Sequence, residues 1–369
     1  MTLLEQFQLW LGGIWPGWAA YIVPGIVGIV IVLAFVVVTV IVFIWYERRL
    51  LGRFQIRLGP NRLGPEGIFQ PIATALKILL KEDIVPAKGD KVIHWLAPVI
   101  VFVPVLMVFA VVPFGEGAIL TDLNVGIVYV VAISSVSTVG IYMAGWASNN
   151  KYALIAALRT VAQMVSYELP VVLAILGVVL MAGSMSMTQI VASQNLPFIV
   201  LQPLGFLIFF LGTVAEMNRS PFDLLEADSE IVAGYHIEYS GMKFAMFYLG
   251  EYGHALAYAC IISTLFLGGW QGPLLPPVIW FLIKVVAVFS VIVWMRATLP
   301  RLRVDQLMAF AWKGLLPMAI INLFIIAAEV LWLPEIMPWI IVAMNFIFAG
   351  ALIVLWSKLF TLGGGRVEV

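Results

Sequence analysis

The sequence predicts an all-α fold, a polytopic membrane bundle of about nine transmembrane helices. Of its 369 residues, 63% are hydrophobic and only 11% are charged, whereas soluble domains carry about 25% charged residues. Many apolar runs exceed the roughly 20 residues that a helix needs to cross a bilayer, and strands of a membrane barrel would give short alternating segments instead. We therefore expect one integral-membrane domain over residues 1–369, with no soluble domain attached.

Nine apolar segments are predicted to cross the membrane. They cover residues 21–46, 92–112, 125–146, 160–182, 199–217, 243–268, 278–298, 313–332 and 337–358. Only a short Leu-Pro-Glu linker at 333–335 separates the last two, so eight spans remain an alternative. The N-terminus lacks the basic region and cleavage site of a signal peptide, and the first segment is therefore expected to be a retained anchor.

The basic residues alternate between the connections. Nineteen of the twenty Lys and Arg residues fall in or beside the odd-numbered connections or at the C-terminal end, and only Lys284 lies deep inside a span. Cytoplasmic loops of membrane proteins carry an excess of Lys and Arg. This pattern places the odd-numbered loops and the C-terminus in the cytoplasm and the N-terminus outside.

The first cytoplasmic loop, residues 47–91, is predicted to contain a short amphipathic helix. Apolar residues recur at helical spacing within Ile68–Lys81, with Lys77 and Lys81 on the opposite side, as in helices that lie at a membrane interface. The Gly-Pro pairs of Arg57–Gly67 fix turns before this helix. Contact with anionic lipid explains the many basic residues, but the Gly-Pro framework indicates a shaped surface for a partner or a ligand.

The second long cytoplasmic loop, about residues 217–242, is acidic. Glu216–Tyr239 holds six acidic residues and a single basic one, Arg219, with apolar side chains between them. Those apolar residues argue against a free surface loop and predict that the segment packs against protein. Glu226 and Glu230 share a face if the segment is helical, where like charges repel and raise at least one pKa. Close carboxylates exchange protons as a coupled set, which indicates a site that holds or moves protons.

Several ionisable residues fall inside predicted spans. Glu168 lies in the fourth, where a charged carboxylate costs about 2.5–3.5 kcal/mol at mid-membrane, so it is expected to be protonated, paired or beside a wet cavity; the alternative is a neutral structural residue. The following Pro170 is able to open the helix. Glu251 and His254 share one face of the sixth span with Tyr258, forming either a polar path or a helix contact.

Two more ionisable residues have open roles. Lys284 is a candidate counter-charge for Glu251 or Glu168, and Glu329, near the end of the eighth span, is expected at the membrane interface.

The chain is not expected to carry a redox cofactor of its own. Its one cysteine, Cys260, excludes an internal disulfide, a structural zinc site and an iron–sulfur cluster. Three histidines are too few and too scattered for a haem or metal site. Neither a G-x-G-x-x-G segment nor a P-loop is present, so electrons for any redox chemistry must come from a partner.

Four polar segments, at residues 46–83, 145–170, 215–245 and 292–308, together resemble the H-subunit family of bacterial NADH:quinone oxidoreductase, equivalent to subunit 1 of mitochondrial complex I. The resemblance implies a proton-translocating translocase subunit of the bacterial inner membrane, active only within the complex. It would anchor the peripheral arm, form much of the quinone cavity and couple quinone reduction to proton pumping.

The same resemblance implies its ligands and partners. Quinone is the substrate, while NADH, FMN and the iron–sulfur clusters belong to partner subunits and none is bound by this chain alone. The expected partners are the iron–sulfur and quinone-site subunits of the peripheral arm, the small membrane subunits and the lipid bilayer. No nucleic acid is expected to bind.

The resemblance also implies site residues. The proton path comprises Glu168, Glu216, Asp223, Glu226, Asp228, Glu230 and Glu251. The quinone cavity comprises Glu47, Arg48, Arg57, Arg62, Gln70, Lys77, Arg219 and Phe222. The chain departs from the family at Thr74, where Asp is common, and at Asp228, where Glu is common.

Two other classes of protein compete with this interpretation. A related subunit of a membrane-bound hydrogenase or formate-linked complex shares much of the architecture, but the full Arg/Gly-Pro first loop favours the quinone enzyme, and the flanking genes would decide. A stand-alone cation-coupled transporter predicts inverted repeats and paired broken helices, which the sequence does not display. Purification as a monomer without iron–sulfur partners would favour the transporter.

Overall fold

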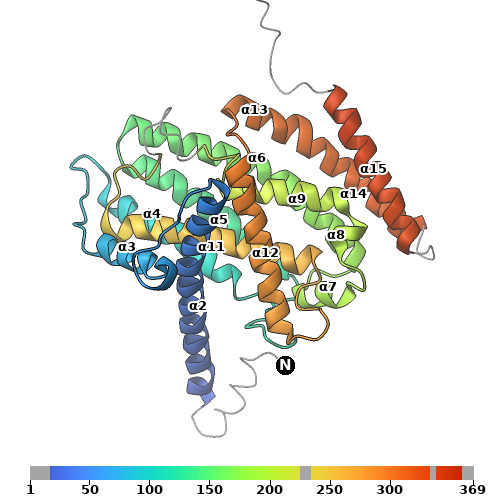
Figure 1. Cartoon of the computed structure of the whole chain (residues 1–369), viewed down its shortest axis with the longest axis horizontal. Coiled ribbons are helices and arrows are strands. Elements are labelled where there is room, and N and C mark those ends of the chain that lie inside the picture. The colour runs from blue at the N-terminus through green and yellow to red at the C-terminus, as the bar shows by residue number, and fades with distance from the viewer. Residues whose placement is uncertain (1–16, 225–233, 333–337, 360–369) are drawn as a thin grey trace, which may run out of the picture.

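The computed structural model describes residues 17–224, 234–332 and 338–359, and all regular elements within them are helices (Figure 1). The long helices are α2 (Gly17–Phe54), α4 (Lys91–Val108), α5 (Gly126–Ala147), α6 (Lys151–Ala182), α9 (Pro203–Glu216), α11 (Gly241–Phe266), α12 (Pro277–Thr298), α14 (Leu316–Trp332) and α15 (Pro338–Leu359). The shorter ones are α3 (Gln70–Leu79), α7 (Met187–Ser193), α8 (Phe198–Leu201) and α13 (Val304–Ala309). The all-α prediction is confirmed.

The chain is a multi-pass membrane protein. Seven described segments are long and apolar enough to cross a bilayer, and each coincides with a predicted span. The other two predicted spans correspond to α9, which has only 14 residues, and to α11, which has 26 residues and carries Glu251 and His254. The linker predicted at 333–335 lies outside the described residues.

Two helices extend further into the connecting segments than the sequence predicts. Helix α2 continues to Phe54 instead of ending near residue 46, and α6 begins at Lys151 instead of residue 160. Glu, Arg, Leu and Ala are strong helix formers, so these charged or polar ends continue the helix beyond the apolar run. The Asn150 side chain accepts a hydrogen bond from the Tyr152 amide (3.0 Å) and caps α6. Pro170 does not break α6, which is continuous around it.

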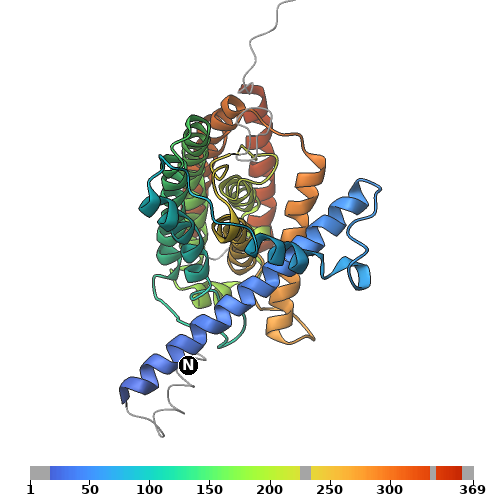
Figure 2. The same cartoon turned by 90° about the vertical axis from the view of Figure 1, so that its left-hand side faces the viewer.

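Helix α11 is the centre of the bundle. It packs against α4, α12, α2 and α3, and α12 lies on the opposite side of it from α4–α6 (Figure 2). All its side chains from Ala255 to Phe266 are buried. The side chains on this part of α11 are therefore held rigidly in the interior of the protein.

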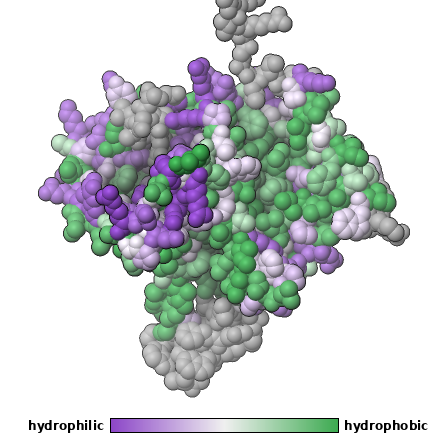
Figure 3. Space-filling view, in the orientation of Figure 1, coloured by the Kyte–Doolittle hydropathy of each residue, from purple (hydrophilic) through white to green (hydrophobic). Residues whose placement is uncertain are grey.

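The surface separates into polar and apolar regions. Hydrophilic residues gather over the first loop, whereas apolar residues cover the side formed by α9, α14 and α8 (Figure 3). Along α2, Ile29 and Ile31 are 67% and 60% exposed. Such apolar exposure is characteristic of surfaces that face lipid or neighbouring subunits.

The amphipathic helix predicted at 68–81 is confirmed as α3, which packs on α2 and α11. Its apolar residues Ile72, Leu76 and Leu79 are exposed, while Pro71 is buried. The predicted apolar stripe therefore faces away from this chain, as expected for a helix at an interface.

Close approach of α5 and α6 requires glycine at position 145. A Cβ atom there would lie 2.3 Å from the Ala157 Cβ and 2.9 Å from the Ala153 carbonyl oxygen. Both atoms belong to a rigid helix, so no side-chain rotation relieves the clash. Small residues at such contacts let membrane helices pack closely.

We predict that Gly145→Ala separates α5 from α6 and lowers the thermal unfolding midpoint of the purified protein. Gly25→Ala is the matched control, because a Cβ there meets nothing within 4 Å. Equal midpoints for the two variants would contradict the close contact.

Candidate functional site

A buried cluster of charges joins α2, α11, α12 and the start of the acidic loop. Arg219 Nη1 lies 3.5 Å from Glu47 Oε1, and Arg219 Nη2 lies 3.2 Å from Glu251 Oε1. Arg296 donates a hydrogen bond to the same Glu47 oxygen. The Arg219 guanidinium also lies over the Tyr252 ring, 4.3 Å from its centroid. We call these five residues the Arg219 cluster.

The Arg219 cluster keeps its central cation charged. Glu47 is 3% exposed and Arg219 is 4% exposed, and burial alone disfavours a charged guanidinium. The carboxylates of Glu251 and Glu47 outweigh that burial and raise the pKa of Arg219 well above its ordinary value. Arginine suits this position because its planar fork offers donors to two carboxylates at once.

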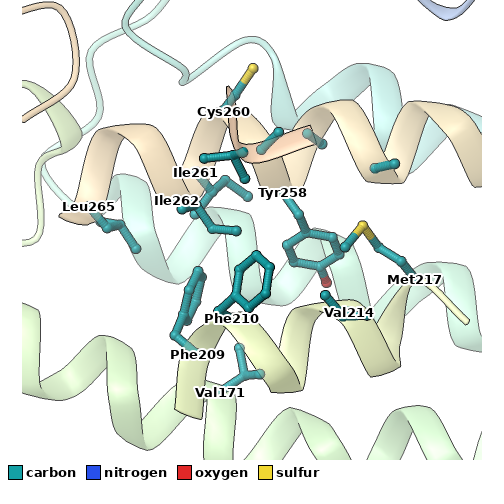
Figure 4. Packing of buried hydrophobic residues seen from close by; sticks show 14 of the residues in the cluster. Val171, Phe209, Phe210, Val214, Met217, Tyr258, Cys260, Ile261, Ile262 and Leu265 are labelled. Atoms are coloured by element: carbon teal, nitrogen blue, oxygen red, sulfur yellow. The ribbon is translucent and has the colours of Figure 1, made fainter. Parts of the chain in front are cut away.

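A second polar cluster lies between α5, α6, α9 and α11. Ser135 Oγ donates a hydrogen bond of 2.6 Å to Glu168 Oε1, and the Tyr258 hydroxyl donates one to Glu216 Oε2. In Figure 4 the Tyr258 side chain points from α11 toward the residues of α9. The other Glu216 oxygen is buried and has no hydrogen-bond partner among the described residues.

Both carboxylates of this second cluster line one small cavity. Its lining residues are Ser134, Ser135, Thr138, Met164, Glu168, Glu216 and Tyr258. Its volume of about 10 Å³ is close to the lower limit for one water molecule. Glu168 therefore lies beside a polar cavity, one of the environments that its position in a span predicts.

Two short stretches of the chain join the clusters. Glu216 and Arg219 are three residues apart in the chain, and Glu251 and Tyr258 are seven residues apart on α11, a rise of about 10 Å. His254 lies between them and is half-buried, and its Nε2 atom is buried without a hydrogen-bond partner among the described residues. The predicted stripe on α11 is present, but its members serve two clusters rather than one continuous contact.

The start of the acidic loop is packed into the protein, as predicted. Phe222 is 2% exposed and contacts the rings of Tyr167 and Phe310. The Gln163 side chain donates hydrogen bonds to the carbonyls of Ala215 (2.7 Å) and Phe222 (2.8 Å). Asp223 is partly exposed beside this packed segment. The predicted residues Glu226, Asp228 and Glu230 lie outside the described residues.

The far end of the acidic loop is attached to the end of the first loop. Ser240 Oγ donates to the Glu82 carbonyl (2.8 Å) and accepts from the Ile84 amide (2.9 Å). Lys243 forms an ion pair with Asp83 at 2.9 Å. The two loops therefore lie on the same side of the bundle, as the charge pattern predicts.

The predicted quinone-cavity residues divide into three groups. Glu47, Arg219 and Phe222 are buried, and Arg48 and Gln70 are partly exposed. Arg57, Arg62 and Lys77 are exposed and do not join the Arg219 cluster. An open groove of about 110 Å³ lies beside the end of α2, lined by Trp45, Tyr46, Arg49, Leu50, Arg53 and Glu66.

Other residues of the site are not evident from the sequence. Arg296 belongs to the Arg219 cluster, although its position at the end of a span is typical of an interfacial charge. Tyr252 and Ser135 are common residue types in membrane helices, so only the folded structure reveals their partners. Thr74, which replaces the family's Asp, donates a hydrogen bond of 3.0 Å to the Gln70 carbonyl of its own helix.

Lys284 is not a counter-charge for either intramembrane acid. Its Nζ donates to the carbonyls of Gly269 (2.8 Å) and Gln271 (2.7 Å), just beyond the end of α11. That interpretation was wrong because the loop after α11 offers nearer acceptors, while Glu251 is paired with Arg219.

No group of three or more His, Cys, Asp or Glu side chains in the described part of the chain is placed to hold a metal ion.

We predict that Arg296→Met lowers stability much more than Glu66→Gln. Removing one partner of a buried ion pair costs about 3–5 kcal/mol, and Glu47 would lose its hydrogen-bonded partner. The exposed pair of Arg49 and Glu66 is worth at most about 1 kcal/mol. Thermal unfolding of the two purified variants checks the difference, and equal midpoints would contradict a stabilising role for the buried cluster.

Comparisons with known proteins identify the family. The family profile described as NADH dehydrogenase matches residues 27–327. The NADH-quinone oxidoreductase H subunit of Dehalococcoides mccartyi (strain CBDB1) is 58% identical over 93% of this chain and 98% of its own length. The H subunit of Carboxydothermus hydrogenoformans is 49% identical over 81% and 87%, and that of Geobacillus kaustophilus is 48% identical over 86% and 97%. The chain therefore belongs to the NADH dehydrogenase family, among the H subunits of NADH-quinone oxidoreductase, as its four polar segments predict.

Proposed function

We propose that this subunit forms much of the quinone-binding cavity and couples quinone reduction to proton translocation. The observation that carries the proposal is the arrangement of the two clusters. One element, α11, places Glu251 beside Arg219 and Tyr258 beside Glu216. A change of charge at the first cluster therefore acts on a helix that also carries the second.

The chemistry begins with electrons from partner subunits. Two electrons and two protons convert a quinone to a quinol. Until the protons arrive, the reduced quinone adds negative charge near the residues that bind it. Next to the Arg219 cluster, that charge competes with Glu47 and Glu251 for the single guanidinium, and so weakens its hold on the Glu251 carboxylate.

The response then passes to the second cluster. Glu168 and Glu216 line the same cavity, so the second cluster offers two carboxylates to a proton. A shift of α11, or of the segment between Glu216 and Arg219, changes the hydrogen bond that Tyr258 donates to Glu216. We propose that this change moves protons along the path toward adjoining subunits of the complex, with Glu226, Asp228 and Glu230 at its cytoplasmic end.

Exposed residues of the first loop fit a role in anchoring the peripheral arm. Ile56 and Leu58 are 97% and 85% exposed, beside the exposed Arg57 and Arg62. Large apolar side chains rarely stay in water on a polar loop, and such patches mark protein interfaces. We propose that peripheral-arm subunits cover this surface on the cytoplasmic side of the bacterial inner membrane, with the N-terminus outside.

The carboxylate path is tested by Glu168→Gln, Glu216→Gln and Glu226→Gln in the assembled complex. Positioned proton-transfer groups contribute about 10²–10⁴-fold, so we expect quinone-dependent proton pumping in membrane vesicles to fall at least about tenfold. Glu116→Gln is the matched control, because Glu116 is exposed in the connection between α4 and α5.

Electron transfer from NADH to a soluble artificial acceptor measures the partner subunits and should not change in any of these variants. Wild-type pumping in all three path variants would reject the proposed proton path.

A further inference from the structure

A buried polar contact outside both clusters joins three helices at the other side of the bundle. Glu329 of α14 is 8% exposed, and Asn345 of α15 is 7% exposed. Asn345 Nδ2 donates one hydrogen bond to Glu329 Oε2 (3.1 Å) and another to the Leu201 carbonyl at the end of α8 (2.8 Å). One side-chain amide thus links α15 to both α14 and α8.

Glu329 differs from its sequence prediction. It lies near the end of α14, beside the 79% exposed Trp332, which agrees with a position close to the membrane boundary. Its carboxyl group, however, is enclosed by the protein instead of facing the interface.

Helix α15 is attached through few buried side chains. Among its side chains from Trp339 to Lys358, only Asn345 and Ala349 are buried. Apolar contacts give little net drive for association in a bilayer, because lipid tails are equally apolar, so polar side chains act as the adhesive. A further hydrogen bond runs from Trp356 Nε1 to the Lys313 carbonyl (2.6 Å), near the opposite end of α15. Among the described residues, the Asn345 bridge is therefore the main polar attachment of the N-terminal half of α15.

The Glu329 carboxyl group has one oxygen without a donor. Glu329 Oε1 is buried without a hydrogen-bond partner in the described part of the chain. No described basic side chain pairs with Glu329. An unpaired buried carboxylate is strongly disfavoured, whereas a bound proton removes the charge and turns one carboxylate oxygen into a hydroxyl group.

We infer that Glu329 is a second proton-binding site, separate from the carboxylate path, and that as a neutral acid it docks α15 through Asn345. The ligand is a proton held at the carboxyl group. The site shares no residue with the Arg219 cluster or with the cavity beside Glu168, so its role does not depend on the proposed coupling function.

The variants Glu329→Gln, Glu329→Leu and Asn345→Leu distinguish a neutral acid from a carboxylate. Glutamine has the size of the protonated acid and both accepts and donates hydrogen bonds, so Glu329→Gln should keep α15 docked. Leucine can do neither, so Glu329→Leu and Asn345→Leu should each release the helix. Cryo-electron microscopy maps of the assembled complex in lipid nanodiscs report this directly, as density for residues 339–358 beside α8 and α14.

Ser357→Ala serves as the control, because Ser357 is exposed on α15 and bonds within its own helix; it should preserve the density. Loss of α15 density in Glu329→Gln would show that a carboxylate, with a bound cation, makes the contact. Retained density in Glu329→Leu or in Asn345→Leu would show that the bridge does not dock the helix. Either result overturns the inference.

Discussion

The site depends on one buried guanidinium held between two carboxylates. Arg219 contacts Glu47 of α2 and Glu251 of α11, while Arg296 of α12 supports Glu47 from another side. Neither Arg219 nor Glu47 would be tolerated alone at its burial, since breaking a buried pair leaves an uncompensated charge. Three helices and the start of the acidic loop are therefore fixed relative to each other by electrostatics. In the proposed function, negative charge on a reduced quinone acts on this contact.

The bilayer explains why such contacts decide the architecture. Helix association in lipid has little hydrophobic driving force, so close packing and polar contacts specify the neighbours. Glycine at 145 allows α5 and α6 to touch, the Arg219 cluster orients α2, α11 and α12, and Asn345 attaches α15. Helix α11 packs against most of these elements and carries polar residues of both clusters. In the proposed mechanism, α11 is the element that transmits a local change of charge.

The hydrophobic runs, the charge alternation and the amphipathic first-loop helix were all predictable, because each arises from local composition and a fixed helical period. The cavity beside Glu168 and the polar face of α11 were predictable only as alternatives, and the burial of Glu47 was not predicted. Sequence gives the face of a helix but not its partner. Lys284 illustrates this. A lone cation in a span suggested a carboxylate as its partner, yet Lys284 donates its hydrogen bonds to backbone carbonyls after α11. Arg296 illustrates the reverse, since an ordinary helix-end charge turned out to complete a buried cluster.

The most direct test of the account is the ratio of protons translocated to electrons passed to quinone in an Arg219→Lys variant of the complex. Lysine keeps the positive charge, but its single ammonium lacks the planar fork that reaches both Glu47 and Glu251. We expect a lower ratio, with electron transfer from NADH to a soluble artificial acceptor unchanged. A wild-type ratio at a wild-type rate of quinone reduction would contradict the claim that Arg219 links the quinone site to the proton path.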